Sequence, residues 1–295
     1  MILVESLSDL RSALAQLPGP VGFVPTMGAL HPGHASLMRQ ARAECRTVVV
    51  SIFVNPKQFG PQEDFSRYPR DLAGDSEVCR AEGVDVVFLP QAAEMYPPGF
   101  ATEVRVGPEL TDKLCGHFRP GHFEGVTTVV AKLFNLVRPD RAYFGQKDFQ
   151  QVRVLTQMVA DLAMPLELVR CPIVREADGL ALSSRNRYLG SEERASALRL
   201  SAALGLLVAS ARAGEPVQPV LDRARAYLEA DPAVRLQYFE VVEERTLEPA
   251  TTFGPGRVAL VAAYVGSTRL IDNALLDPEG PDRALAARAP KETLK

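Results

Sequence analysis

Segments with strand-like and with helix-like patterns of apolar residues alternate over the first 170 residues of the chain. Thr47–Val54 is almost unbroken and rich in β-branched residues, which is typical of a strand buried on both faces. His34–Cys45 instead repeats apolar residues at helical spacing, through Leu37 and Met38. The same patterns predict further strands at Val21–Pro25, Asp85–Leu89, Arg141–Phe144 and Leu166–Arg170, and helices at Leu72–Glu82, Glu124–Val137 and Phe149–Leu162.

The alternation of strands and helices predicts the fold class. Apolar strands separated by helices form a parallel sheet that is covered on both faces, and right-handed crossovers make it doubly wound. We therefore expect an α/β domain over residues 1–175. Ligands of such a sheet bind beyond the carboxyl ends of its strands, where the strand order reverses.

The pattern changes after about residue 175. Long helices are predicted at Ser191–Ala213 and Val217–Ala230, followed by short strands at Gln237–Val242, Val258–Val265 and Arg269–Ile271. This order predicts a smaller C-terminal α+β domain over residues 176–295, which we expect to cover the active site. The Pro- and Ala-rich end of the chain is expected to fray from about residue 278.

Composition and charge exclude several classes of protein. The 295 residues carry a formal net charge of −3, so no global basic field attracts nucleic acid or an anionic membrane. No apolar stretch approaches the ~20 residues of a membrane span, and Glu5 and Asp9 stand where a signal peptide would be basic and then apolar. The four cysteines are widely spaced without a C-x-x-C pair, which fits a reducing cytoplasm.

The segment PTMGALHPGH follows the first predicted strand and carries an H-x-G-H motif, His31 to His34. Gly33 lets a phosphate approach the backbone, and the start of the next helix offers unpaired N–H donors and a positive dipole end. Two imidazoles can then donate to phosphate oxygens. A two-histidine metal site and two surface histidines at a helix cap are the alternatives.

Four more polar segments contain candidate ligands. NPKQFG follows the second main strand with the amides of Asn55 and Gln58, and RPGHFEG opens a helix with one arginine and one histidine. FGQKDFQQ offers Lys147 for a phosphate and Asp148 for a ribose hydroxyl. LSSRN places two hydroxyls beside a guanidinium. Ordinary capped turns and a salt bridge between Lys147 and Asp148 are the alternative interpretations.

Taken in order and spacing, PTMGALHPGH, FVNPKQFG, RPGHFEGV, FGQKDFQQ and GLALSSRNRYL resemble the motifs of the pantoate–β-alanine ligase family. That family belongs to the H-x-G-H nucleotidylyltransferases, which are built on a Rossmann-like sheet. The resemblance implies that ATP and (R)-pantoate form pantoyl adenylate and pyrophosphate with Mg²⁺. β-Alanine then displaces AMP to give pantothenate. It also implies a homodimer.

The resemblance assigns roles residue by residue. It implies that His34 is the proton donor and His31 its partner, with Lys147 and Arg185 completing the catalytic set. Gln58 and Gln151 are expected to hold pantoate, with Asn55 beside them, and Asp75 is expected to face Mg²⁺. The remaining implied ATP contacts, beyond His31, His34, Lys147 and Arg185, are Met27, Gly28, Ala29, Leu30, Pro32, Gly33, Gly145, Gln146, Asp148, Val174, Leu182, Ser183 and Ser184.

Other functions compete with this hypothesis. Another nucleotidylyltransferase would need extra basic residues for a phosphorylated acceptor, whereas Gln58 and Gln151 favour a hydroxy acid. A non-catalytic nucleotide sensor would not need His31, His34, Lys147 and Arg185 together. A structural metal protein could use His31, His34, His117 and His122. One departure is Cys115, which stands where some family members carry an acid before a glycine, so that acid's role does not transfer.

Overall fold

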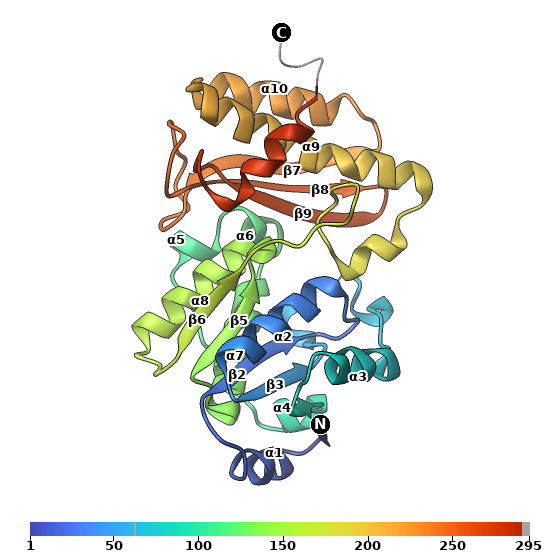
Figure 1. The fold of residues 1–295 in the computed structure, drawn as a ribbon, viewed down its shortest axis with the longest axis vertical. Coiled ribbons are helices and arrows are strands. Elements are labelled where there is room, and N and C mark those ends of the chain that lie inside the picture. Colours follow the sequence, from blue (N-terminus) through green and yellow to red (C-terminus); the bar gives the residue numbers. More distant parts are fainter. Residues whose placement is uncertain (62, 291–295) are drawn as a thin grey trace. The chain divides into compact units, whose positions relative to one another are not determined.

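The computed structural model describes residues 1–61 and 63–290, and the chain divides into two compact units (Figure 1). Unit 1 comprises Met1–Gly145 and Gln151–Cys171. Unit 2 comprises Gln146–Gln150 and the chain from Pro172 onward. The boundary lies close to the one expected at residue 175. The assignment of Gln146–Gln150 to unit 2 is a difference that no sequence pattern indicated.

Unit 1 contains a six-stranded sheet in the order β1-β4-β3-β2-β5-β6. Every strand pairing in this sheet is parallel, as the buried apolar strands predicted. The strands are β1 (Ile2–Val4), β2 (Val21–Thr26), β3 (Thr47–Ile52), β4 (Val86–Phe88), β5 (Arg141–Gly145) and β6 (Glu167–Cys171). The predicted Rossmann-like α/β fold is confirmed.

The strand order reverses between β2 and β5. From β2 the chain moves outward through β3 to β4, and the later strands β5 and β6 lie on the other side of β2. The loops after β2 and β5 therefore leave neighbouring strands at the carboxyl edge of the sheet. This is the position where open α/β sheets bind their ligands.

Helices cover both faces of this sheet. Phe23 and Val49 share one apolar core with α1 (Leu7–Leu14), α7 (His122–Val137) and α8 (Phe149–Asp161). Val24 and Val50, the next residues along the same strands, share a second core with α2 (Pro32–Glu44) and α3 (Leu72–Ala81). Successive strand residues point to opposite faces, so burial on both sides explains the unbroken apolar runs.

Short elements connect these layers. The sequence analysis did not predict β1 or α1. A strand of three residues such as β1 is too short to show a period. The other short elements of unit 1 are η1 (Pro56–Gln58), η2 (Phe65–Arg67), α4 (Ala92–Met95), α5 (Pro108–Thr111) and α6 (Cys115–Phe118).

Unit 2 pairs helices with a small antiparallel sheet, as expected for an α+β domain. The strands β7 (Val234–Glu243), β8 (Arg257–Val265) and β9 (Thr268–Leu275) run in that order. The helices α9 (Ser191–Ala213) and α10 (Val217–Glu229) share one apolar core with this sheet. Two short helices, η3 (Gln146–Asp148) and η4 (Ser184–Tyr188), belong to the same unit.

One helix among the described residues, α9, is long and apolar enough to cross a membrane by length and composition alone. Of the 18-residue window that meets this test, 61% is buried inside the protein. Leu200, Leu204 and Leu207 on α9 are at most 2% exposed and lie in the core of unit 2. A core helix has the same composition, so this one helix is weak support for a membrane span.

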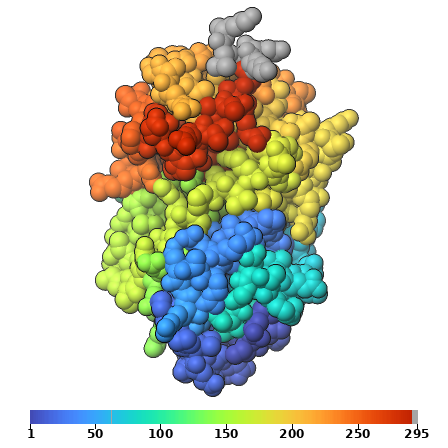
Figure 2. Space-filling view, viewed as in Figure 1, coloured from blue at the N-terminus to red at the C-terminus, as the bar shows by residue number. Residues whose placement is uncertain are grey.

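The fraying expected from about residue 278 stays a prediction. Within that stretch the structure has η5 (Pro281–Arg288), whose Leu285 is 4% exposed in the core of unit 2. Residues 291–295 lie outside the described residues. A Cβ atom at Gly205 of α9 would lie 2.4 Å from the carbonyl oxygen of Leu285, so the glycine permits this close contact. Figure 2 shows the η5 segment, in red, packed on the surface of its own unit.

Candidate active site

The loop after β2 is held by a buried carboxylate. Asp75 on α3 is 3% exposed, and its two oxygens accept the backbone N–H groups of Ala29 at 3.0 Å and Leu30 at 2.6 Å. Gly28 has a φ of +81°, and a Cβ atom there would lie 2.8 Å from the Asp75 carboxylate. Ala29 also has a positive φ, of 51°. The loop therefore has two successive residues with positive φ, and the hydrogen bonds to Asp75 stabilise this backbone conformation.

His31 and His34 cap the first turn of α2. The Nδ1 atom of His31, the N-cap residue, accepts the N–H of Gly33 at 3.1 Å. The Nδ1 atom of His34 accepts the N–H of His31 at 3.3 Å, and the two ring centroids lie 4.0 Å apart. Because Nδ1 is an acceptor in both rings, each neutral ring carries its proton on Nε2. The motif thus provides two neighbouring Nε2–H donors beside the N-terminus of α2.

Asn55 orients Gln58 in the segment after β3. Asn55 is 1% exposed, and its Nδ2 donates to Gln58 Oε1 at 2.9 Å and to the Gly125 carbonyl at 3.1 Å. Its Oδ1 accepts the Tyr96 hydroxyl at 2.7 Å and a backbone N–H at 3.2 Å. With Oε1 occupied, Gln58 directs Nε2 toward Met27 Sδ, 3.2 Å away. The geometry assigns Asn55 to orienting Gln58, and its direct contact with substrate stays a prediction.

The backbone of Gln58 is held by an arginine and a histidine. Its carbonyl accepts Arg119 Nη2 at 3.2 Å and His122 Nδ1 at 2.8 Å. Arg119 also binds both carboxylate oxygens of Glu63 at 2.6 Å each. Burial lowers the pKa of Arg119, but the hydrogen bond to Glu63, together with the effects of Cys115 and of the Glu63 charge, outweighs this and the pKa is raised. The Arg119 guanidinium therefore binds Glu63 and the Gln58 carbonyl at the same time.

Gln151 lies in the first turn of α8 and is half-buried. Its helix follows β5, the strand next to β2. Gln151, Gln58 and the H-x-G-H segment thus all belong to unit 1 and follow strands at one edge of its sheet. Gly145 is the last residue of β5 at the same edge.

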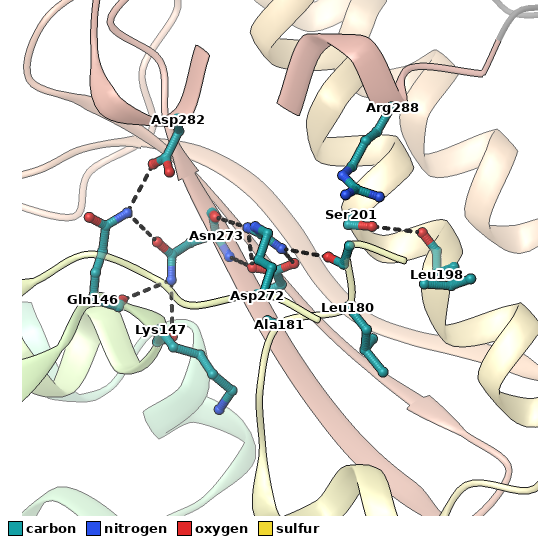
Figure 3. A network of polar contacts seen from close by, with 12 residues as sticks. Gln146, Lys147, Leu180, Ala181, Leu198, Ser201, Asp272, Asn273, Asp282 and Arg288 are labelled. Carbon is teal, nitrogen blue, oxygen red and sulfur yellow. Dashed lines mark hydrogen bonds and ion pairs between the residues drawn. The ribbon is translucent and has the colours of Figure 1, made fainter. Parts of the chain in front are cut away.

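The remaining predicted contacts belong to unit 2. Lys147 and Asp148 lie in η3, and their charged atoms are 3.7 Å apart, so the ion pair considered as an alternative is present as a loose contact. Gln146 is 3% exposed. Its amide contacts Asn273 and Asp282 (Figure 3).

The two segments near residues 174 and 185 are joined by hydrogen bonds. The N–H of Leu182 donates to the Val174 carbonyl at 3.0 Å. Ser183 caps η4 by accepting the N–H of Arg185 at 3.3 Å, and Ser184 is 8% exposed. The polar loop expected here is therefore a short capped helix.

The metal contact predicted at Asp75 can be compared with the donor side chains of the described residues. Among them, no group of three His, Cys, Asp or Glu side chains is placed to hold an ion. Both oxygens of Asp75, the carboxylate expected to face Mg²⁺, accept backbone N–H groups. Asp75 therefore holds the loop after β2, and its contact with Mg²⁺ stays a prediction.

The sequence analysis did not predict four residues that support the site. Glu63, Tyr96, Asn273 and Asp282 each hold a predicted site residue in place. Glu63 lies 56 positions from Arg119 and Asn273 lies 127 positions from Gln146. No local pattern joins residues so far apart.

Comparison with known proteins agrees with this geometry. A family model described as pantoate-beta-alanine ligase matches residues 2–275. The chain belongs to the pantoate–β-alanine ligase family. It is therefore an enzyme, a ligase of pantothenate biosynthesis. A pantothenate synthetase of Acidobacterium capsulatum is 58% identical over 92% of this chain and 96% of the relative.

Other relatives and solved structures extend the comparison. The chain is 54% identical to a bifunctional pantoate ligase/cytidylate kinase of Thermosynechococcus vestitus and spans about half of it, 52%. The pantothenate synthetase structure from Thermus thermophilus has a TM-score of 0.91 at 49% identity, over 94% of this chain and 100% of that one. A Francisella tularensis ligase, complexed with β,γ-ATP and β-alanine, has a TM-score of 0.76 at 33% identity, over 93% and 97%.

Proposed function

We propose that this ligase condenses (R)-pantoate with β-alanine in two half-reactions. In the first, a carboxylate oxygen of pantoate attacks the α-phosphorus of ATP, and pyrophosphate leaves. In the second, the amine of β-alanine attacks the acyl carbon of pantoyl adenylate, AMP leaves and the amine loses a proton. Adenylation is needed because a free carboxylate has no leaving group that an amine can displace. The observation that carries the proposal is that the Nδ1 atoms of His31 and His34 both accept backbone N–H groups at the N-terminus of α2, which assigns the ring protons to Nε2.

The two histidines act as hydrogen-bond donors to the phosphates. Their Nδ1 atoms are occupied by backbone N–H groups, so the Nε2–H groups of His31 and His34 are the ring atoms suited to bind phosphate oxygens. The first turn of α2 adds backbone donors and a positive dipole end. Charge that develops on the α-phosphate during attack is stabilised by these fixed donors.

Gln58 and Gln151 bind pantoate. The Gln58 amide is held at Oε1 by Asn55, and its Nε2 faces the sulfur of Met27, a weak acceptor. A hydroxyl or carboxylate oxygen is a better acceptor and would displace that contact. A neutral amide suits a substrate whose carboxylate must remain reactive as a nucleophile.

Two further stretches of the chain, residues 145–148 and 174–185, bind the rest of the nucleotide. Lys147 contacts the α-phosphate, Asp148 the ribose together with Gly145, and Val174 the adenine through its backbone. Leu182, Ser183, Ser184 and Arg185 bind the outer phosphates, because two hydroxyls and a guanidinium suit phosphate oxygens. Mg²⁺ enters as the complex of ATP, since this ion is commonly held by substrate phosphates with few protein ligands.

Exchange of labelled pyrophosphate into ATP tests the proposal. With β-alanine absent, exchange that requires pantoate would establish the adenylate half-reaction. ATP binding without any exchange would contradict it and would favour the nucleotide sensor. Exchange independent of pantoate would point to another acceptor and to a different nucleotidylyltransferase.

The proposal includes the cellular compartment of the enzyme and its oligomeric state. We place it in the cytoplasm as a homodimer that acts on small molecules and binds neither nucleic acid nor membrane. All four cysteines lie in the described part of the chain, are buried and form no disulfide, which suits a reducing compartment. Light scattering coupled to size exclusion would measure the mass: twice 32.1 kDa supports the dimer, and 32.1 kDa contradicts it.

A further inference from the structure

Two adjacent residues of β9 contact both segments that bind nucleotide in the proposed function. Asp272 is 4% exposed and Asn273 is fully buried. Asn273 reaches the Gln146–Lys147 segment, and Asp272 reaches Arg175, which lies between Val174 and the segment that begins at Leu182. Figure 3 shows these contacts converging on one stretch of β9. All of these residues belong to unit 2.

The side chain of Asn273 makes three hydrogen bonds to the Gln146–Lys147 segment. Its Nδ2 donates to the carbonyls of Gln146 and Lys147, each at 2.9 Å. Its Oδ1 accepts Gln146 Nε2 at 3.2 Å. Two carbonyl partners require the nitrogen on that side, so the orientation of the amide is determined. The backbone that carries Lys147 is thus attached to a strand 126 positions later in the chain.

The end of the chain adds a second attachment. Gln146 Nε2 also donates to Asp282 Oδ2 at 2.9 Å, and the same oxygen accepts the N–H of Leu275 at 2.8 Å. Asp282 lies in η5, whose Leu285 is buried in the core of unit 2. The position of Gln146 therefore depends on β9 and on η5 together.

Asp272 holds the segment that leads from Arg175 to Leu182 in a similar way. Its oxygens bind Arg175 Nη1 at 2.7 Å and Nη2 at 2.9 Å. The strand-like bridge between Arg175 and Ala181 directly precedes Leu182. Burial lowers the pKa of Arg175, but the charge and hydrogen bonds of Asp272 outweigh this effect and the pKa is raised. A buried bidentate pair of this kind fixes geometry as well as charge.

We propose that Asp272 and Asn273 are positioning residues for nucleotide binding. They hold the Lys147 backbone and the Leu182–Arg185 segment at a fixed separation, so that the two bind one polyphosphate together without either β9 residue contacting it. This inference rests on the proposed roles of Lys147 and Arg185. A misplacement of about 1 Å between such groups is enough to weaken binding and catalysis.

The test uses Asn273→Asp in the full-length chain. This substitution keeps the size of the side chain and the acceptor for Gln146, but it puts a carboxylate oxygen against two carbonyls. We expect the KM for ATP in pantoate-dependent pyrophosphate exchange to rise at least about tenfold, which corresponds to the loss of one to two hydrogen bonds. The KM for pantoate should change less than about twofold. An unchanged KM for ATP overturns the inference.

Matched controls separate positioning from general loss of stability. Ser210→Ala removes a buried hydroxyl from the same unit, where Ser210 donates to Glu215 at 2.7 Å. Asp272→Asn is compared with Glu240→Gln, which weakens the Arg225–Glu240 pair at 2.8 Å. Asp272→Asn should raise the KM for ATP, and the two control variants should leave it unchanged. An equal rise in the controls would overturn the positioning role.

If a variant is inactive, its affinity for ATP can still be measured without turnover. Titration calorimetry gives the Kd for ATP without turnover, and hydrogen exchange reports the protection of residues 146–148. Weaker ATP binding with faster exchange at these residues supports the inference, whereas wild-type values for both overturn it. Failure of the wild-type enzyme to exchange pyrophosphate would instead contradict the proposed function itself.

Discussion

The carboxylate of Asp75 accepts the backbone N–H of Leu30 at 2.6 Å, although the two residues are 45 positions apart. A second oxygen accepts the N–H of Ala29. A single buried side chain on α3 therefore maintains the backbone of the loop that leads into the H-x-G-H motif. Removing one such buried acceptor leaves an amide without its partner, which costs about 1–3 kcal/mol.

Asp75→Asn is expected to destabilise the protein and weaken ATP binding. The amide retains one acceptor oxygen and places an NH₂ group against the other backbone N–H. We expect the free energy of unfolding in urea to fall by about 1–3 kcal/mol and the Kd for ATP to rise. Asp71→Asn, at the exposed N-cap of the same helix, is the control for a general effect on α3. Equal behaviour of both variants would contradict the specific role of Asp75.

His31→Asn and His31→Ala separate capping from chemistry. Asparagine is a good N-cap residue, so His31→Asn should keep the stability of α2, whereas His31→Ala should lose about 0.5–2 kcal/mol. Neither variant has an Nε2–H group, and both should lose most of the pantoate-dependent pyrophosphate exchange. The measurements are thermal unfolding and the exchange rate. Full exchange by His31→Asn would mean that the imidazole serves only as a cap.

Arg119→Lys is expected to weaken pantoate binding. Lysine cannot reproduce the bidentate contact with Glu63 and the bond to the Gln58 carbonyl together, so the Gln58 segment loses its support. We expect the KM for pantoate to rise about threefold to tenfold, with a smaller change in the KM for ATP.

Arg39→Lys is the matched control for Arg119→Lys. Arg39 also forms a bidentate pair, with Glu82 at 2.8 and 3.0 Å, but its side chain is 62% exposed. Exposed pairs contribute little to stability, so this variant should behave as wild type. If both variants left the KM for pantoate unchanged, the support of Gln58 by Arg119 would be refuted.

Two buried thiols predict a loss of stability at alkaline pH. Burial, with a smaller effect from Asp75, raises the pKa of Cys79 from 9.0 to about 12, and burial raises the pKa of Cys171 to about 11. Unfolded thiols ionise near their ordinary pKa, so the unfolded state releases protons first. The free energy of unfolding should therefore fall as the pH rises from about 9 to about 12, by less than about 1.4 kcal/mol per pH unit for each thiol.

Urea denaturation at pH 8, 9 and 10 measures this effect. Cys79→Ala should show a shallower decline with pH than wild type, even though the substitution lowers stability at pH 8. Alkylation with iodoacetamide at pH 8 is a second readout, and neither thiol should react in the folded protein. Rapid labelling of Cys79 without unfolding would contradict its burial.

The α/β fold and the segments at the carboxyl edge of the sheet could be predicted from the order of residues alone. A nearly unbroken apolar run such as Thr47–Val54 is typical of a strand buried on both faces, and this predicts a parallel sheet. The H-x-G-H motif lies directly after a strand, so its place in the fold followed from local order. These features are local in the chain, which is why periodicity and motifs could predict them.

The residues that hold those segments in place could be found only from the packing of the folded chain. Asp75 supports the loop after β2, Glu63 engages Arg119, and Asn273 attaches the Lys147 backbone to β9. Each contact joins residues 45 to 126 positions apart, and each depends on burial that excludes competing water. The same reason explains why η5 is ordered: its Ala-rich sequence has no marked pattern, but Leu285 completes the apolar core of unit 2.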